Sequence, residues 1–323
     1  MLSVLERIPR RSQLLVINYH RIGRRAETPF DPEVFSVDQE VFDAQVGLLK
    51  RSYGLVDEAE ALDIVAGRSK PQSTAVLLTF DDGYRDNLTL AVPVLKAHGA
   101  KAIFFLVTGY LENPAQIPWW DRIAWLVRGC EGKVLELSQP EPWSILVDKG
   151  DIEHVIARVL SRFRSPLMMD AELFFAELER CSDRGQPAQE EPLLMGWDDA
   201  RRLREEGMDV GLHTHSHEIL AKLDAAGQAR ELAGCKDMMR REMGYDASTL
   251  AYPVGSHGAF TPVTKQLAQE AGFSAAFSFY GGTNPVGAID PFDVKRVSFA
   301  GDTHNSRSRA AVALMATSGS IWF

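Results

Sequence analysis

Two adjacent aspartates, Asp81 and Asp82, end the apolar run of "LLTFDDGY". Like charges this close disfavour each other unless a cation or a shared proton intervenes. Far downstream, "GLHTHSH" also follows an apolar run, and its outer histidines, His213 and His217, are four residues apart. Two imidazoles and one carboxylate can hold a divalent metal and leave coordination positions open for water and substrate. The residue types therefore predict a metal site that joins the two stretches.

In such a site the two aspartates would have different tasks. One would bind the ion, and the other would stay unligated beside it, where a carboxylate can accept a proton from water. His213 and His217 can turn to one side if the chain rolls into a helical turn, and His215 would then point away. Each motif by itself has a simpler explanation, because Asp-Asp-Gly is common turn chemistry and the histidines also suit a polar loop. Their joint occurrence after two apolar runs favours the metal site.

Strand-like and helix-like segments alternate along most of the chain. Apolar runs predict strands at 14–19, 75–80, 102–107, 208–212, 248–252 and 273–279, and amphipathic stretches predict helices at 37–51, 87–99, 197–207, 226–243 and 261–272. This alternation is typical of a parallel sheet with crossover helices, and about seven such units favour a barrel over an open sheet. Parallel β/α folds carry their chemistry at the carboxyl ends of the strands, where Asp81, Asp82 and His213 are expected.

We predict one domain over residues 1–323, interrupted by an insertion on the barrel rim at 112–194. The insertion breaks the strand–helix alternation, contains amphipathic helices at 151–163 and 170–181, and ends in the polar stretch "DRGQPAQEEP". No internal repeat is present. The sequence thus predicts an α/β fold with a helical insertion.

Composition excludes some classes of function. The formal net charge is −9 and no basic stripe is present, so we expect no nucleic-acid partner. Three cysteines lack any pairing or ligand spacing and indicate free thiols in a reducing compartment. The N-terminus does not match a signal peptide and no apolar run reaches membrane-spanning length, so we expect a cytoplasmic protein without a transmembrane segment. The "MLSV" start leaves peripheral membrane contact open.

The two motifs resemble those of the polysaccharide deacetylases, metal-dependent carbohydrate esterases of the NodB-homology type. "TFDDGY" and "GLHTHSHEIL" occur in the family's order, and the resemblance covers roughly residues 13–110 and 194–300. It implies an irregular (β/α)₇ barrel, similar to a TIM barrel. It also implies that Asp81 is the catalytic base and that Asp82, His213 and His217 bind a divalent metal. Zn²⁺ is expected first, with Ni²⁺, Co²⁺ and Fe²⁺ as alternatives.

The sequence departs from the family in its third motif, which typically contains Arg-x-Pro-Tyr. Here "AYPVG" places Ala251 at the arginine position and Val254 at the tyrosine position. The resemblance implies that the Val254 backbone N–H contributes to the oxyanion site, because a backbone donor needs no particular side chain. Arg296 resembles an arginine that one branch of the family supplies from a later strand, and its implied role is to steady Asp81. Tyr252, in the same stretch, is a candidate substrate contact.

The family's usual C-terminal Leu-x-His motif, which supplies the acid, is also absent. "VINYHRIG" near the N-terminus resembles a permuted form of that motif, found in deacetylases that act on poly-N-acetylglucosamine. The first and last strands of a closed barrel are neighbours, so a histidine missing at one end can be supplied from the other. The resemblance implies that His20 is the general acid, and the alternative is a histidine packed in the core beside Tyr19.

The implied activity is metal-dependent hydrolysis of N-acetyl groups on amino sugars of a poly- or oligosaccharide, in exopolysaccharide or cell-envelope biosynthesis. Trp119, Trp120 and Asp121 of the insertion are candidate substrate contacts, since sugar rings pack well on aromatic side chains, although the tryptophans would equally anchor the insertion. Alternatives are a deformylase or deacetylase of a lipid-linked sugar, a hydrolase of a cyclic amide, an inactive sugar-binding module, or a structural subunit of an assembly complex.

Overall fold

The computed structural model describes residues 12–165, 167–187 and 191–299. They form two compact units. The barrel unit contains the described parts of residues 1–23, 35–114 and 192–323, and the second unit contains those of residues 24–34 and 115–191. The second unit therefore overlaps the predicted insertion at 112–194 and adds the segment 24–34 to it.

Seven parallel strands form the barrel. They are β1 (Gln13–Tyr19), β5 (Thr74–Phe80), β6 (Ile103–Leu106), β9 (Asp209–Leu212), β10 (Thr249–Ala251), β11 (Ala275–Phe277) and β13 (Arg296–Ser298). The sheet runs from β1 through β5, β6, β9 and β10 to β11, and β13 pairs with β1. Phe277 of β11 also bridges to Val294, just before β13, which closes the ring of strands. This confirms the predicted irregular (β/α)₇ barrel.

The two central strands are apolar almost throughout because both of their faces are buried. Every residue of β1 and β5 is buried. Alternate residues of β1 enter different cores: Leu15 and Ile17 pack toward the surrounding helices, whereas Leu14 and Val16 pack with residues from the other strands and α3 (Glu58–Val65). This two-sided burial fixes the strand register, so the carboxyl ends of β1 and β5 deliver their polar residues to one place.

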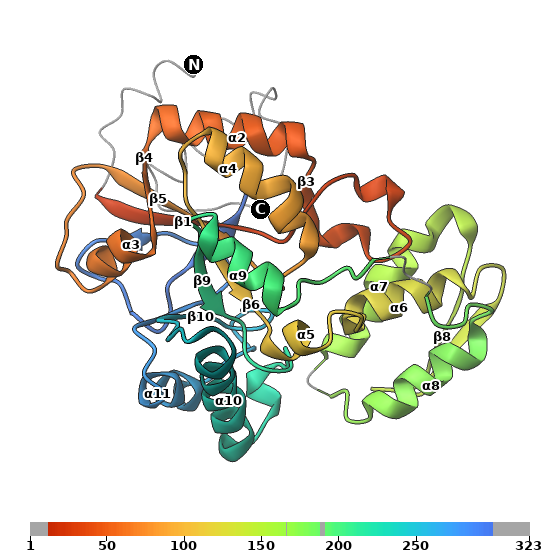
Figure 1. The fold of residues 1–323 in the computed structure, drawn as a ribbon. Helices are drawn as coiled ribbons and strands as arrows, with labels where there is room; N and C mark the ends of the chain where they lie inside the picture. Colours follow the sequence, from red (N-terminus) through yellow and green to blue (C-terminus); the bar gives the residue numbers. More distant parts are fainter. Residues whose placement is uncertain (1–11, 166, 188–190, 300–323) are drawn as a thin grey trace. The chain divides into compact units, whose positions relative to one another are not determined.

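Helices surround the barrel strands (Figure 1). Besides α3 they are α2 (Gln39–Ser52), α4 (Val92–Ala97), α5 (Thr108–Glu112), α9 (Trp197–Glu205), α10 (Ala225–Met243) and α11 (Pro262–Glu270). The predicted helix at 87–99 is divided into a π-helical turn, Asn87–Ala91, and α4. Shorter elements complete the unit: β2 (Arg21–Ile22) pairs with β3 (Phe35–Val37), β4 (Gly54–Val56) with β5, and β12 (Asn284–Pro285) with β1, and a 3₁₀ turn covers Leu220–Lys222.

The second unit has its own core. Helices α6 (Trp119–Arg128), α7 (Ile152–Arg164) and α8 (Ala171–Cys181) pack together with a hairpin of β7 (Val134–Leu137) and β8 (Trp143–Leu146). Short 3₁₀ turns cover Arg25–Glu27, Pro32–Val34 and Lys149–Asp151. The helices at 152–164 and 171–181 confirm the two predicted amphipathic segments, whereas the hairpin was not predicted.

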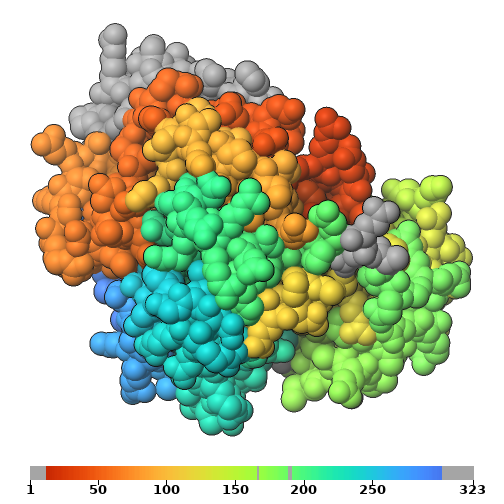
Figure 2. Space-filling view, viewed as in Figure 1, coloured from red at the N-terminus to blue at the C-terminus, as the bar shows by residue number. Residues whose placement is uncertain are grey.

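Within the described ranges, no helix is both long and apolar enough to cross a membrane. The N-terminal "MLSV" stretch lies outside the described residues. So does the C-terminal segment, in which the Leu-x-His motif of the family is missing. The three cysteines, Cys130, Cys181 and Cys235, are free thiols, as predicted. Helix α9 and part of α10 lie at the molecular surface (Figure 2).

Candidate active site

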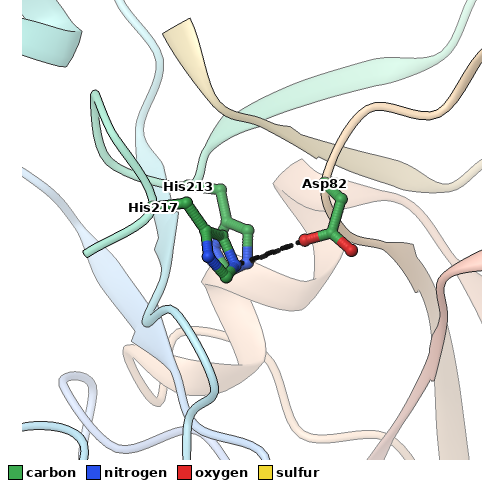
Figure 3. A group of neighbouring side chains, drawn as sticks. All are labelled: Asp82, His213 and His217. Atoms are coloured by element: carbon green, nitrogen blue, oxygen red, sulfur yellow. Dashed lines mark ion pairs between the residues drawn. The ribbon is translucent and has the colours of Figure 1, made fainter. Parts of the chain in front are cut away.

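Asp82, His213 and His217 converge at the carboxyl ends of β5 and β9 (Figure 3). The Nε2 atoms of His213 and His217 lie 3.6 Å and 3.4 Å from Oδ1 of Asp82. One candidate ligand atom from each residue lies within 4.8 Å of the others, and all three side chains are buried. Two imidazole nitrogens and a carboxylate oxygen at this spacing suit a divalent ion with open coordination positions.

The hydrogen bonds of His213 prepare it to act as a ligand. Its Nδ1 lies 2.8 Å from the carbonyl oxygen of Ala251, which can only accept, so Nδ1 carries the proton and Nε2 keeps its lone pair. Burial lowers the pKa of His213 to about 4, so the ring is neutral near pH 7. Ala251, the last residue of β10, therefore fixes the tautomer of His213 whose Nε2 faces Asp82.

Asp81 is held by a buried arginine from the last barrel strand. Nη1 and Nη2 of Arg296 lie 2.7 Å and 2.8 Å from the two carboxylate oxygens of Asp81, and Asn18 donates from Nδ2 to Oδ2 at 3.0 Å. Burial opposes ionisation of Asp81 most strongly, but the charge of Arg296, its hydrogen bonds and the neighbouring imidazoles together hold the pKa of Asp81 below its usual value. Asp81 is therefore an ionised acceptor, 4.0 Å from Nε2 of His213.

His20 lies at the carboxyl end of β1 beside both aspartates. Its backbone N–H donates to Ser36 Oγ and its carbonyl accepts from Asn87 Nδ2, which fixes the backbone on both sides. Its ring centroid is 5.7 Å from that of Phe279. Burial raises the pKa of Asp82, whereas hydrogen bonding from His217 and electrostatic interactions with His20, His217 and His213 lower it, with a net decrease. His20 is thus near enough to interact electrostatically with the site.

All four non-glycine residues with positive φ in the described part of the chain lie in the three stretches that carry the candidate site residues: Asp82 (75°), Thr214 (66°), His217 (59°) and Val254 (63°). Aspartate and histidine adopt this region more readily than most residues, whereas for the β-branched threonine and valine it is a genuine outlier. Such conformations cost about 1–3 kcal/mol each and persist only where the surroundings determine them. The concentration of strained backbone marks the site independently of its side chains.

Val254 forms the centre of a tight three-residue turn. The Gly255 N–H donates to the carbonyl of Pro253 at 2.7 Å, which together with the φ of Val254 defines a rare γ-turn. Gly255 cannot be replaced by a larger residue, because a Cβ atom there would lie 2.6 Å from the backbone nitrogen of Phe279. Within the described residues, no acceptor pairs with the Val254 N–H. The turn follows Ala251, the partner of His213.

Three of the four predicted substrate contacts are buried within the fold. Tyr252 is fully buried, stacks on Phe260 and donates its hydroxyl to the carbonyl of Phe292. In the second unit, Trp120 is buried and its ring contacts that of Trp119. The ring centroids of Trp119 and Phe163 lie 4.8 Å apart.

Asp121, also in the second unit, is fully buried and accepts a hydrogen bond from the backbone of Asp31. These surroundings explain Tyr252, Trp120 and Asp121 as packing residues.

Two polar residues of the site were missed by the sequence analysis. Asn18 links Asp81 to Arg296, since its Oδ1 accepts from Nη1 of Arg296 at 2.9 Å. Thr79 donates from Oγ1 to that same Asn18 oxygen at 2.8 Å. Both side chains are buried within apolar strands. A polar residue inside "LLVINY" or "AVLLTF" needs a buried partner, and that is the signal that could have indicated them.

The fold and the site together define a β/α-barrel protein with a candidate Asp-His-His metal centre at the carboxyl ends of its strands. The sequence profile of the family described as polysaccharide deacetylase matches residues 68–276, well over half of the chain. The protein belongs to the polysaccharide deacetylase family, whose members hydrolyse the C–N bond of N-acetyl groups.

Individual relatives agree with this assignment. The curated protein YxkH of Bacillus subtilis (strain 168), which carries the same family name, is 33% identical over 97 residues, or 30% of this chain and 32% of its own length. The matched part thus spans about a third of that relative. IcaB from Ammonifex degensii has a similar fold, with a TM-score of 0.58, 19% identity, and coverage of 95% of this chain and 98% of its own.

A de-N-acetylase from Aggregatibacter actinomycetemcomitans also has a TM-score of 0.58, with 16% identity and coverage of 94% and 100%. At these identities the structural comparisons show a shared fold.

Proposed function

We propose that the protein is a metal-dependent hydrolase that removes N-acetyl groups from the amino sugars of a poly- or oligosaccharide. The observation that carries the proposal is the separation of tasks between neighbouring carboxylates: Asp82 faces the two imidazoles, while Asp81 is bound by Arg296 and Asn18. One acid is thereby available to a metal and the other to a proton. Family membership and the fold shared with a de-N-acetylase support the same chemistry.

Asp82, His213 and His217 fit a divalent ion and would hold it. The fit rests on the Nε2 lone pair that the bond from His213 to Ala251 leaves free, and on the neutral state of the buried ring. When bound, the ion supplies Lewis-acid polarisation of the amide carbonyl and makes water more acidic. Zn²⁺ suits two imidazoles and a carboxylate, and Ni²⁺, Co²⁺ and Fe²⁺ bind the same ligand types.

Asp81 is the proposed general base. Its carboxylate is ionised, and its Oδ2 lies 4.0 Å from Nε2 of His213. The two-pronged contact with Arg296 holds the carboxylate in a single orientation. A carboxylate so oriented can take the proton of an attacking water. Arg296 and Asn18 act through Asp81 and are positioning residues.

His20 is the proposed general acid and the Val254 N–H the proposed oxyanion donor. An amide nitrogen leaves poorly unless it is protonated, so a second titratable group is needed opposite the base. His20 lies beside Asp81 and Asp82, with its backbone held by Ser36 and Asn87. The Val254 turn offers a backbone donor three residues after Ala251, whose carbonyl accepts from the proposed ligand His213.

Among the substrate contacts expected from sequence, only Trp119 is partly exposed, and it is retained as a contact to be tested. We propose a polymeric substrate of the exopolysaccharide type rather than a lipid-linked sugar, and the polysaccharide named in the description of the family supports this choice.

The test is acetate release from N-acetylglucosamine oligomers before and after chelation. We expect acetate release by the metal-loaded protein, its loss on chelation and its return when Zn²⁺ or Co²⁺ is added back. His213→Ala should lower the bound metal measured by elemental analysis. Full activity in metal-free protein would refute the metal dependence. Sugar binding without acetate release by the metal-loaded protein would instead indicate an inactive binding module.

A further inference from the structure

The ligand loop, residues 213–217, carries two of the proposed metal ligands in a strained conformation. Thr214 and His217 both have positive φ, and no glycine is present in the loop to relieve the strain. Inside the loop, the His217 N–H donates to Thr214 Oγ1 at 3.2 Å. One internal hydrogen bond offsets only part of the conformational cost of two such residues. Contacts from outside the loop must therefore hold it.

Glu231 of α10 holds the outer side of the ligand loop. Its Oε2 accepts from the backbone N–H groups of His215 at 3.0 Å and Ser216 at 2.9 Å, and its Oε1 accepts from Ser216 Oγ at 2.7 Å. Two successive backbone N–H groups that point to one spot form a concavity that binds anions. In this protein the anion is the carboxylate of Glu231, delivered from a separate helix.

The first turn of α5 holds the opposite side of the loop. The backbone N–H groups of Thr108 and Gly109 donate to the carbonyls of Thr214 and His215 at 3.2 Å and 2.8 Å. A Cβ atom at Gly109 would lie 2.6 Å from the His215 carbonyl oxygen, so the approach needs glycine. The loop is thus fixed between two helices, by donors on one side and an acceptor on the other.

We propose that Glu231 is a positioning residue that sets the metal affinity of the site by holding His213 and His217 in register with Asp82. This inference rests on the proposed metal-dependent function. Partners behind the ligands orient them and typically change metal affinity 10–100-fold when removed. Glu231 is not among the three candidate ligands, and its contacts are with His215 and Ser216, between the two proposed histidine ligands.

The experiment measures metal affinity and apoprotein stability in a graded series. Glu231→Ala removes all three contacts. Glu231→Gln can keep them, because its amide oxygen accepts from both backbone donors and its NH₂ group donates to Ser216 Oγ, but it loses the charge. Glu242→Gln is the matched control, since Glu242 lies on the same helix and its carboxylate contacts Arg241. Zn²⁺ affinity is measured by competition with a chromophoric chelator, and melting of the metal-free proteins is recorded in parallel.

We expect Glu231→Ala to weaken Zn²⁺ binding 10–100-fold, Glu231→Gln less than 10-fold, and Glu242→Gln not at all. A purely structural role would lower apoprotein melting in Glu231→Ala while its Zn²⁺ affinity stayed that of the wild type, and this result would overturn the inference. If Glu231→Ala does not fold, Ser216→Ala removes one contact and should weaken Zn²⁺ binding severalfold, whereas unchanged affinity there overturns the inference.

The wild-type protein separates the two failures. Absence of Zn²⁺ binding by the wild type would refute the proposed function, and the inference with it. Tight Zn²⁺ binding by the wild type together with unchanged binding by the variants would refute the inference alone.

Discussion

Arg296 and Asp81 form a two-pronged ion pair across 215 residues of chain, with N–O distances of 2.7 Å and 2.8 Å. Both side chains are buried, at 0% and 3% exposure. Taking two charges out of water is costly, and geometry as close as this is what offsets that cost. The pair therefore couples the stability of the barrel to the ionisation of the proposed base.

Removal of Arg296 should affect both properties. Arg296→Ala would leave Asp81 buried without its counterion, and we expect a loss of about 3–5 kcal/mol in the free energy of unfolding. Arg296→Lys keeps the charge but cannot make both contacts, so its loss should be smaller while activity still falls. Urea unfolding and acetate release check the two effects. A wild-type unfolding midpoint for Arg296→Ala would contradict the coupling.

Asp81→Asn tests the proposed base separately from the proposed metal ligands. An amide cannot take the water proton, so we expect turnover to fall by roughly 10²–10⁴-fold. Asp82, His213 and His217 are unchanged, so the metal content per chain should match the wild type. The measurements are acetate release and elemental analysis on the same sample. Wild-type turnover would exclude Asp81 as the base, and loss of metal would show that it is a ligand.

His20→Ala tests the proposed acid by the leaving group of the substrate. Hydrolysis of the N-acetyl amide should fall by roughly 10²–10⁴-fold, because the departing amine needs a proton. Hydrolysis of 4-nitrophenyl acetate should fall far less, since 4-nitrophenolate leaves without one. Rates on the two substrates are compared in the same preparation. Equal losses on both would indicate that His20 is needed for packing rather than for proton transfer.

Glu58 predicts a pH dependence of stability remote from the proposed chemistry. It is buried between Thr249, which donates to its Oε1 at 2.7 Å, and Asp209, and burial raises its pKa to about 7. The folded state therefore binds a proton more tightly than the unfolded chain, whose carboxyl titrates near 4.5. The resulting decrease in the free energy of unfolding is absent below about pH 4.5, grows as the pH rises and is complete above about pH 7.

Glu58→Gln should remove this decrease, because the amide oxygen still accepts from Thr249. We expect the variant to be more stable than the wild type at pH 8, by up to roughly 3 kcal/mol, and nearly equal to it at pH 4.5. Denaturant unfolding across this range measures the difference. Glu136→Gln, on the exposed face of β7, is the control. A difference that does not vary with pH would show that Glu58 does not titrate in this window.

The sequence was most informative where a signal is local. The apolar runs of β1 and β5 are continuous because both faces are buried, so the strands and their carboxyl ends could be predicted. Asp82, His213 and His217 follow such runs at recognisable spacing.

Other features depend on contacts that no local pattern contains. Glu231 resembles any other glutamate of a surface helix until its partners are seen, and Asn18 looks like an isolated exception in an apolar strand. The left-handed conformation of Val254 could not be predicted, because glycine, the residue that usually indicates this conformation, does not occupy the position.

The place of β13 beside β1 has a consequence for biosynthesis. Asp81 emerges from the ribosome 215 residues before Arg296, and at 5–20 residues per second this corresponds to roughly 10–40 s. During that interval the carboxylate has no counterion, so the nascent barrel is disfavoured from sealing around it. Asp82, which follows β5, and His213, which follows β9, have both been synthesised by then. Cotranslational folding would therefore form the proposed cation site first and enclose the proposed base last.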